Sequence, residues 1–206
     1  MAARDAARPA VDVADPGMIA ELGHFALVLA FVLALAQSTI PFAGALRNDD
    51  RLIGVAPAAA VMQFLLVGLA FAALVHAYIV SDFSVLNVFE NSHSEKPLLY
   101  KITGTWGNHE GSMLLWVLIL ALFGALVAVL GANLPDRLKA LVLSVQGWIA
   151  AAFLLFILLT SNPFLRLVPA PIEGNDLNPV LQDIGLAVHP PLLYLGYVGC
   201  SISFAL

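Results

Sequence analysis

Charged side chains are scarce in this sequence. Of its 206 residues only 11% are Asp, Glu, Lys or Arg, whereas a soluble domain carries about 25%. Hydrophobic residues reach 61%. So apolar a composition excludes an ordinary soluble globular domain and indicates an integral membrane protein.

Basic residues and cysteine are scarcer still. Nine Lys and Arg stand against 14 Asp and Glu, which gives a formal net charge of −5. Nucleic acid is therefore excluded as a partner, because binding phosphates requires a dense basic surface. The single cysteine, Cys200, excludes an intrachain disulfide, and its place in an apolar run favours a small buried side chain over thiol chemistry.

Long apolar runs are what the sequence has in abundance. Four of them reach about the 20 residues that a bilayer span needs. A fifth run has only 17 residues and ends without a turn or a basic flank, which predicts an incomplete span and a chain that is the front part of a longer polypeptide or one piece of a split protein. The predicted fold class is all-α, a polytopic transmembrane helix bundle. Its expected spans are 25–46, 55–80, 112–131, 140–160 and 190–206.

The first 17 residues differ from the rest. They are rich in Ala, Asp, Arg and Pro and lack the apolar core of a signal peptide. We expect residues 1–17 to be a disordered tail, or an over-extended reading frame whose real start is Met18. Residues 18–206 then form one membrane domain.

Loop charges predict the orientation of the bundle. Lys and Arg are denser in the two short loops, 47–51 and 132–139, than in the long ones. The positive-inside rule places these short loops inside, and the N-terminus and both long loops outside. His93, His109 and His189 then share the outer face.

The first long loop contains the motif WGNHEGS, which starts at Trp106. His109 and Glu110 resemble half of a zinc-protease motif, but the second histidine would fall at position 113, which is Met, so zinc proteolysis is excluded. The glycines match no phosphate-binding motif. We interpret the segment as an ordered interfacial turn, with Trp106 and Trp116 on either side of a helix start and glycines that permit close backbone approach.

The second long loop leads to His189. Its density of Pro, Asn and Asp predicts turns ordered by the loop's own hydrogen bonds. Pro190 and Pro191 predict that a helix begins there, with His189 just before it at the membrane surface. An imidazole held in that place suits an axial ligand of haem iron, although residue type alone favours a capping or interfacial histidine.

Five segments, in the same order, resemble the N-terminal part of the CcmF family of cytochrome c-type biogenesis proteins, which are haem-handling membrane proteins. The segments are residues 82–85, 106–118, 160–164, 173–183 and 189–197. The resemblance implies a haem lyase component of the bacterial inner membrane, with its site on the periplasmic face. Such a component joins haem vinyl groups to the cysteine thiols of apocytochrome c. The implied partners are a haem-carrier protein, apocytochrome c, thiol-reducing proteins and the rest of a CcmF-like protein.

The resemblance also assigns site residues. It implies that His189 is the first of two external histidines that ligate iron, with haem b bound transiently as a substrate. The family's tryptophan-rich haem platform and second external histidine do not occur in this chain, so we expect it neither to bind haem tightly nor to complete the reaction alone. Residues expected to support the site are Trp106, His109, Glu110, Trp116, Pro190, Pro191 and Tyr194.

Two other function classes stay open. A non-catalytic membrane scaffold within an assembly complex would need no haem ligand. A transporter subunit would be expected to show a buried ionisable pair or a broken helix at the membrane midplane, and the first four spans show neither. His24 could face the site, although an interfacial polar residue is the favoured interpretation, and the resemblance gives His76 no ligand role.

Overall fold

The structure is a computed structural model that describes residues 18–176 and 178–206. The expected tail or false start at 1–17 lies outside the described residues. The described chain is helical, and its only β pairing is an isolated antiparallel bridge between Val85 and Arg166. The all-α fold class is confirmed.

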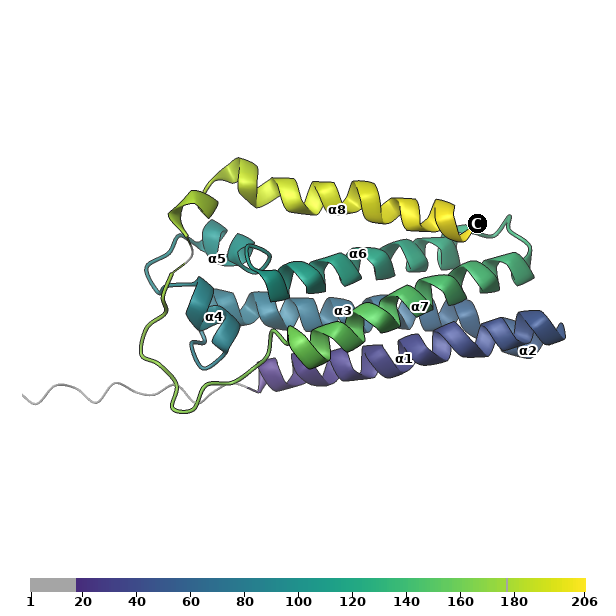
Figure 1. Cartoon of the computed structure of the whole chain (residues 1–206), viewed down its shortest axis with the longest axis horizontal. Helices are drawn as coiled ribbons and strands as arrows, with labels where there is room; N and C mark the ends of the chain where they lie inside the picture. Colours follow the sequence, from purple (N-terminus) through teal and green to yellow (C-terminus); the bar gives the residue numbers. More distant parts are fainter. Residues whose placement is uncertain (1–17, 177) are drawn as a thin grey trace, which may run out of the picture.

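Five long helices form the bundle, and shorter ones lie between them (Figure 1). The long helices are α1 (Ile19–Arg47), α3 (Val55–Ile79), α6 (His109–Leu130), α7 (Asp136–Thr160) and α8 (Ile184–Ala205). The short ones are α2 (Asp50–Ile53), α4 (Leu86–Asn91), α5 (Leu98–Gly104) and the 3-10 helix η1 (Pro179–Leu181).

Four helical segments are long and apolar enough to cross a membrane: Ile19–Arg47, Asp50–Ile79, His109–Leu130 and Asp136–Thr160. They coincide with the first four predicted spans. The first begins six residues earlier than predicted, because the apolar window misses a polar first turn in which Glu21 forms an ion pair with Arg166 at 2.7 Å. α8 is 22 residues long and contains no Asp, Glu, Lys or Arg.

Small residues let the long helices approach closely. A Cβ added at Gly147 of α7 would lie 2.8 Å from the backbone nitrogen of Ser38 in α1. Buried alanines, among them Ala30 and Ala34, line α1. Apolar solvent drives little association between membrane helices, so close van der Waals packing of this kind holds the bundle together.

Buried amides add hydrogen bonds between spans. The Gln37 side chain donates to the Leu143 carbonyl at 2.9 Å, which ties α1 to α7. Gln146 donates to the Ser201 carbonyl at 3.1 Å and accepts from the Ser201 hydroxyl at 3.2 Å, which ties α7 to α8. The side chains that make these bonds, Gln37, Gln146 and Ser201, are polar but uncharged.

α8 is the outermost helix and packs along one side, mainly against α6 (Figure 1). Cys200 is exposed on it, so the prediction of a buried cysteine is wrong. The reason is that an apolar run predicts membrane depth but not which face of a helix meets other helices. The outer surface of α8 also exposes Leu192 and Phe204.

The two long loops lie at one end of the bundle and are bonded to each other (Figure 1). Leu86 and Leu167 donate backbone N–H groups across to Leu165 and Ser84 at 2.8 and 2.7 Å. Residues 175 and 176 donate to carbonyls of the first loop at 2.7 and 3.1 Å. The prediction that the second loop is ordered by its own hydrogen bonds is wrong in this respect, because turn residues reveal local geometry but not partners far away in sequence.

An ion pair between Lys96 and Asp176 and hydrogen bonds to the Glu173 carboxylate strengthen this pairing of the loops. The Lys96 ammonium lies 3.0 Å from Asp176, with its side chain only 1% exposed, and burial lowers the pKa of Lys96. Glu173 accepts hydrogen bonds from the Ser94 hydroxyl at 2.5 Å and from the Ser94 backbone N–H at 3.0 Å. The bond from the Ser94 hydroxyl lowers the pKa of Glu173 from its ordinary 4.5 to about 2.

Glu173→Gln should loosen the paired loops. Because the folded pKa lies below the unfolded one, the ionised carboxylate stabilises the pairing above about pH 4.5, and this contribution is lost as the pH falls through about 2. Removing the charge at an exposed hydrogen-bonded site should speed amide exchange at Ser94 and Gly174 by roughly threefold to tenfold at pH 7. Hydrogen exchange with mass spectrometry measures this. The control Glu95→Gln, whose carboxylate is exposed, should exchange like the wild type, and equal rates in both variants would contradict the assignment.

Candidate functional site

His189 lies inside α8, five residues after its first residue, Ile184. The prediction that the helix begins at Pro190 is therefore wrong. The start is set instead by Asp183, whose carboxylate accepts from the Gly185 N–H at 2.8 Å, as an N-terminal capping residue does. Pro190 and Pro191 stand in the second turn, as the seventh and eighth helical residues.

Trp106 explains how the helix tolerates these prolines. Its indole N–H donates to the Ala187 carbonyl at 2.8 Å. In a regular α-helix that carbonyl accepts from the N–H four residues later, which Pro191 does not have. Trp106 comes from the turn between α5 and α6, and its ring stacks on Phe71 of α3 with centroids 6.4 Å apart.

A cavity of about 470 Å³ lies beside this hydrogen bond. Four of the residues predicted to support a site meet in it, namely Trp106, His109, Pro190 and Tyr194. The Tyr194 hydroxyl closes one wall by bonding to the Ser112 hydroxyl. The remaining lining residues are Thr103, Gly107, Asn108, Met113 and Ala187.

His189 is on the other side of the same helix. Ala187, Pro190 and Tyr194 follow a helical spacing of three and four residues and so share one face. At about 100° per residue, His189 is turned from these three residues by about 100° to 160°. Its side chain is exposed, and no described residue forms a hydrogen bond or ring contact with it. The imidazole is thus available to a ligand that approaches the unpacked face of α8.

His109 and Glu110 are engaged in the protein. The His109 ring lies 3.1 Å from the Ser161 hydroxyl and meets the Phe156 ring edge-on. Glu110 accepts from the Asn87 side chain at 3.2 Å. Both contacts hold the loop end of α6 against its neighbours.

Trp116 does not lie at the cavity. It stands seven residues into α6 and stacks on Phe153 of α7, with ring centroids 4.0 Å apart. Trp106 and Trp116 therefore pack in different parts of the bundle. Trp106 fixes α8, and Trp116 packs α6 against α7.

Sequence reasoning missed an asparagine network beneath the cavity. Asn108 accepts from the Gly111 N–H at 2.8 Å, which caps α6, and also from the Asn87 side chain at 2.9 Å. Its own amide donates to the Tyr78 hydroxyl and the Gly104 carbonyl, both at 2.9 Å. The signal was available for the cap, because an Asn just before an apolar run is a common N-terminal cap.

The other histidines, His24, His76 and His93, lie apart from one another and from the cavity. His24 lies 3.4 Å from the Asn162 amide and stacks on Phe164, and His93 lies 3.9 Å from Glu173. His76 is exposed on α3. Within residues 18–176 and 178–206 there is no group of three or more His, Cys, Asp or Glu side chains that could hold a metal ion.

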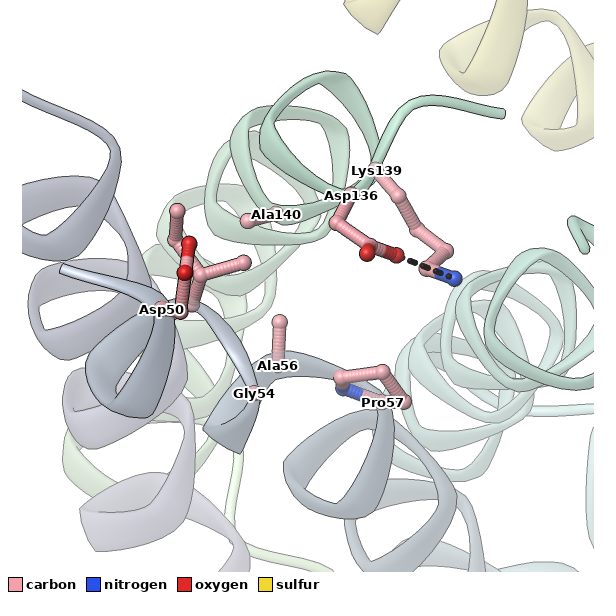
Figure 2. A pocket seen from close by; sticks show the side chains of 8 residues that line it. Asp50, Gly54, Ala56, Pro57, Asp136, Lys139 and Ala140 are labelled. Carbon is pink, nitrogen blue, oxygen red and sulfur yellow. Dashed lines mark ion pairs between the residues drawn. The ribbon is translucent and has the colours of Figure 1, made fainter. Parts of the chain in front are cut away.

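A second pocket, of about 180 Å³, lies at the opposite end of the bundle (Figure 2). Asp136 and Lys139 line it and form an ion pair at 3.3 Å, and Asp50, Gly54 and Pro57 lie around them. Neither histidine nor an aromatic ring lines this pocket. The side chains suited to binding a ligand therefore gather at the loop end.

Comparisons with known proteins point to one family. The family described as "Cytochrome C assembly protein" matches residues 106–206. "Cytochrome c-type biogenesis protein CycK" of Bradyrhizobium diazoefficiens is 70% identical over 188 residues, which are 91% of this chain and 28% of that protein. "Cytochrome c-type biogenesis protein CcmF" of Pseudomonas aeruginosa is 52% identical over 189 residues, 91% of this chain and 29% of that protein.

A solved structure agrees. The chain titled "Cytochrome c Heme Lyase CcmF" matches with a TM-score of 0.78 and 29% identity, over 96% of this chain and 31% of that one. The present chain thus spans less than a third of the length of the relatives that it matches.

Proposed function

The chain belongs to the CcmF and CycK family of cytochrome c assembly proteins, and from that premise we propose that it forms part of a haem lyase that attaches haem to apocytochrome c. It is a multi-pass membrane protein by its apolar helices and its relatives. The proposed location is the bacterial inner membrane, with the loop end of the bundle in the periplasm. The proposed partners are a haem carrier, apocytochrome c and thiol-reducing proteins.

In this proposal His189 supplies one axial ligand to the iron of a haem b substrate. The observation that carries it is an exposed imidazole, without a partner among the described residues, on the unpacked face of α8. The start of this helix is fixed by the Asp183 cap and by the bond from Trp106 to the Ala187 carbonyl. A neutral imidazole binds iron through one ring nitrogen and leaves the edge of the porphyrin accessible. The second ligand would come from the part of the longer relatives that this chain does not match.

The role of such a histidine is positioning. Attachment forms a thioether bond between each haem vinyl group and a cysteine thiol, and the protein must hold the vinyl edge where the thiols arrive. Holding two reactants in register lowers the entropic part of the barrier without any acid or base in the site. Trp106, Pro190, Pro191 and Tyr194 contribute by fixing the helix that carries His189.

His189→Ala tests the proposal in a full-length protein assembled with the remaining family segments. We expect haem content after purification to fall at least about tenfold and the low-spin spectrum of two histidine ligands to disappear, because one of the two iron bonds is lost. Added imidazole should restore part of the spectrum. The matched control is His76→Ala, which removes another exposed histidine and should leave the spectrum unchanged.

The same variants distinguish haem ligation by His189 from the second candidate function, that of a scaffold that does not bind haem. Strongly exposed apolar side chains on the second long loop favour partner contact, notably Val168, Ile172 and Val180. If His189→Ala keeps its haem and still captures the maturation partners, haem ligation by His189 is contradicted and the scaffold accounts for the protein.

A further inference from the structure

We propose that Trp106 is a positioning residue for His189, and that it acts by supplying the hydrogen bond that the two prolines remove from α8. The inference rests on the proposed function, since it concerns how the ligand histidine is held. It assigns to Trp106 a specific atom, the indole Nε1, and a specific target, the carbonyl oxygen of Ala187.

The double proline singles out one carbonyl. A helical carbonyl can accept from the N–H four residues on in α geometry, or three residues on in 3-10 geometry. For Ala187 these two positions are Pro191 and Pro190, and neither has an N–H. The neighbouring carbonyls each keep one of the two choices, because residues 189 and 192 carry N–H groups.

The deprived carbonyl is also shielded from water. Ala187 is only 4% exposed, and it lines the cavity next to Trp106. A buried carbonyl without a partner is costly, so a side-chain donor must take the place of the backbone. The indole N–H is a donor only and makes this bond at 2.8 Å, across 81 residues of sequence.

The bond fixes the direction of His189. Two prolines in the second turn permit the helix to bend at that point, and a bend would swing the residues before it. His189 is two residues after the bonded carbonyl, in the same turn. Trp106 is itself held by its stack on Phe71 of α3. Through Trp106, the start of α8 is therefore held in a fixed position relative to α3.

Trp106→Phe keeps an aromatic ring at Phe71 and removes only the donor. We expect amide exchange across residues 185–195 of the haem-free protein to rise roughly tenfold, as for loss of a buried hydrogen bond. In the holoprotein the low-spin haem spectrum and the haem reduction potential should both change. Trp148→Phe is the control, because Trp148 is 52% exposed and takes part in no hydrogen bond among the described residues.

Pro191→Ala provides the decisive rescue. It restores an N–H at position 191 that can bond the Ala187 carbonyl, so Trp106→Phe in this background should change exchange and haem spectrum by less than about twofold. Equal damage by Trp106→Phe with and without Pro191→Ala would overturn the inference, as would a harmless Trp106→Phe. His189→Ala separates the two claims: if it loses haem while Trp106→Phe keeps a wild-type spectrum, ligation stands and the positioning role fails.

Discussion

Gly111→Ala should prevent the loop end of the bundle from folding. A Cβ at this position would lie 1.6 Å from the Thr105 carbonyl oxygen and 2.8 Å from its carbon, far inside any tolerated contact. The atoms it meets are backbone atoms of a buried residue, so no side-chain rotation can relieve the overlap. Relief requires moving the turn that carries Trp106 away from α6. The expected loss of more than about 4 kcal/mol is a large part of a typical folding free energy.

The measurement is the yield of monodisperse protein in detergent, together with its melting temperature. Gly124→Ala is the matched control on the same helix, because a Cβ there meets nothing within 4 Å. It should be neutral or stabilise the protein by up to about 1 kcal/mol, since alanine favours a helix more than glycine does. A Gly111→Ala protein that melts at the same temperature as the control would contradict the close approach.

How far the sequence predicts this fold depends on how far apart in the sequence the interacting residues are. The runs at 112–131 and 140–160 correspond to α6 and α7 because a span is specified by its own apolar residues. The start of α8 was misplaced because a local rule about proline competes with a local cap at Asp183 and with a hydrogen bond from Trp106 far away in sequence. Periodicity and propensity contain no information about the second of these.

The candidate site shows the same division. The motif residues Trp106 and His109 and the α8 residues Pro190 and Tyr194 were selected from sequence, and they meet at one cavity. Sequence alone did not reveal that His189 points away from that cavity, because this depends on the side of α8 that packs on α6. It also could not reveal that Asn87 and Tyr78, from two different elements, share the Asn108 amide.

Asn108→Leu should be the most damaging change of a polar side chain. Asn108 uses both its donor and its acceptor group: it accepts from Gly111 and Asn87, and it donates to Tyr78, Gly104 and, at 3.3 Å, the Thr105 carbonyl. Leucine is close in size but removes these bonds, which leaves the Gly111 N–H and the buried Thr105 carbonyl without the partner that Asn108 gives them. We expect a loss of about 2–4 kcal/mol, from about 1 for the cap and about 1–3 for the unpaired buried carbonyl. Thermal or urea unfolding in detergent measures it.

Asn108→Asp divides this loss into its two halves. Aspartate keeps both acceptor oxygens, and with them the cap on α6, but loses the two donors to Tyr78 and Gly104. Its stability should therefore lie between those of the wild type and Asn108→Leu. Asn178→Leu is the control, because this asparagine caps only the exposed 3-10 helix η1 and should cost no more than about 1 kcal/mol. If Asn108→Leu costs no more than this control, the network beneath the cavity does not hold α6 to the loop.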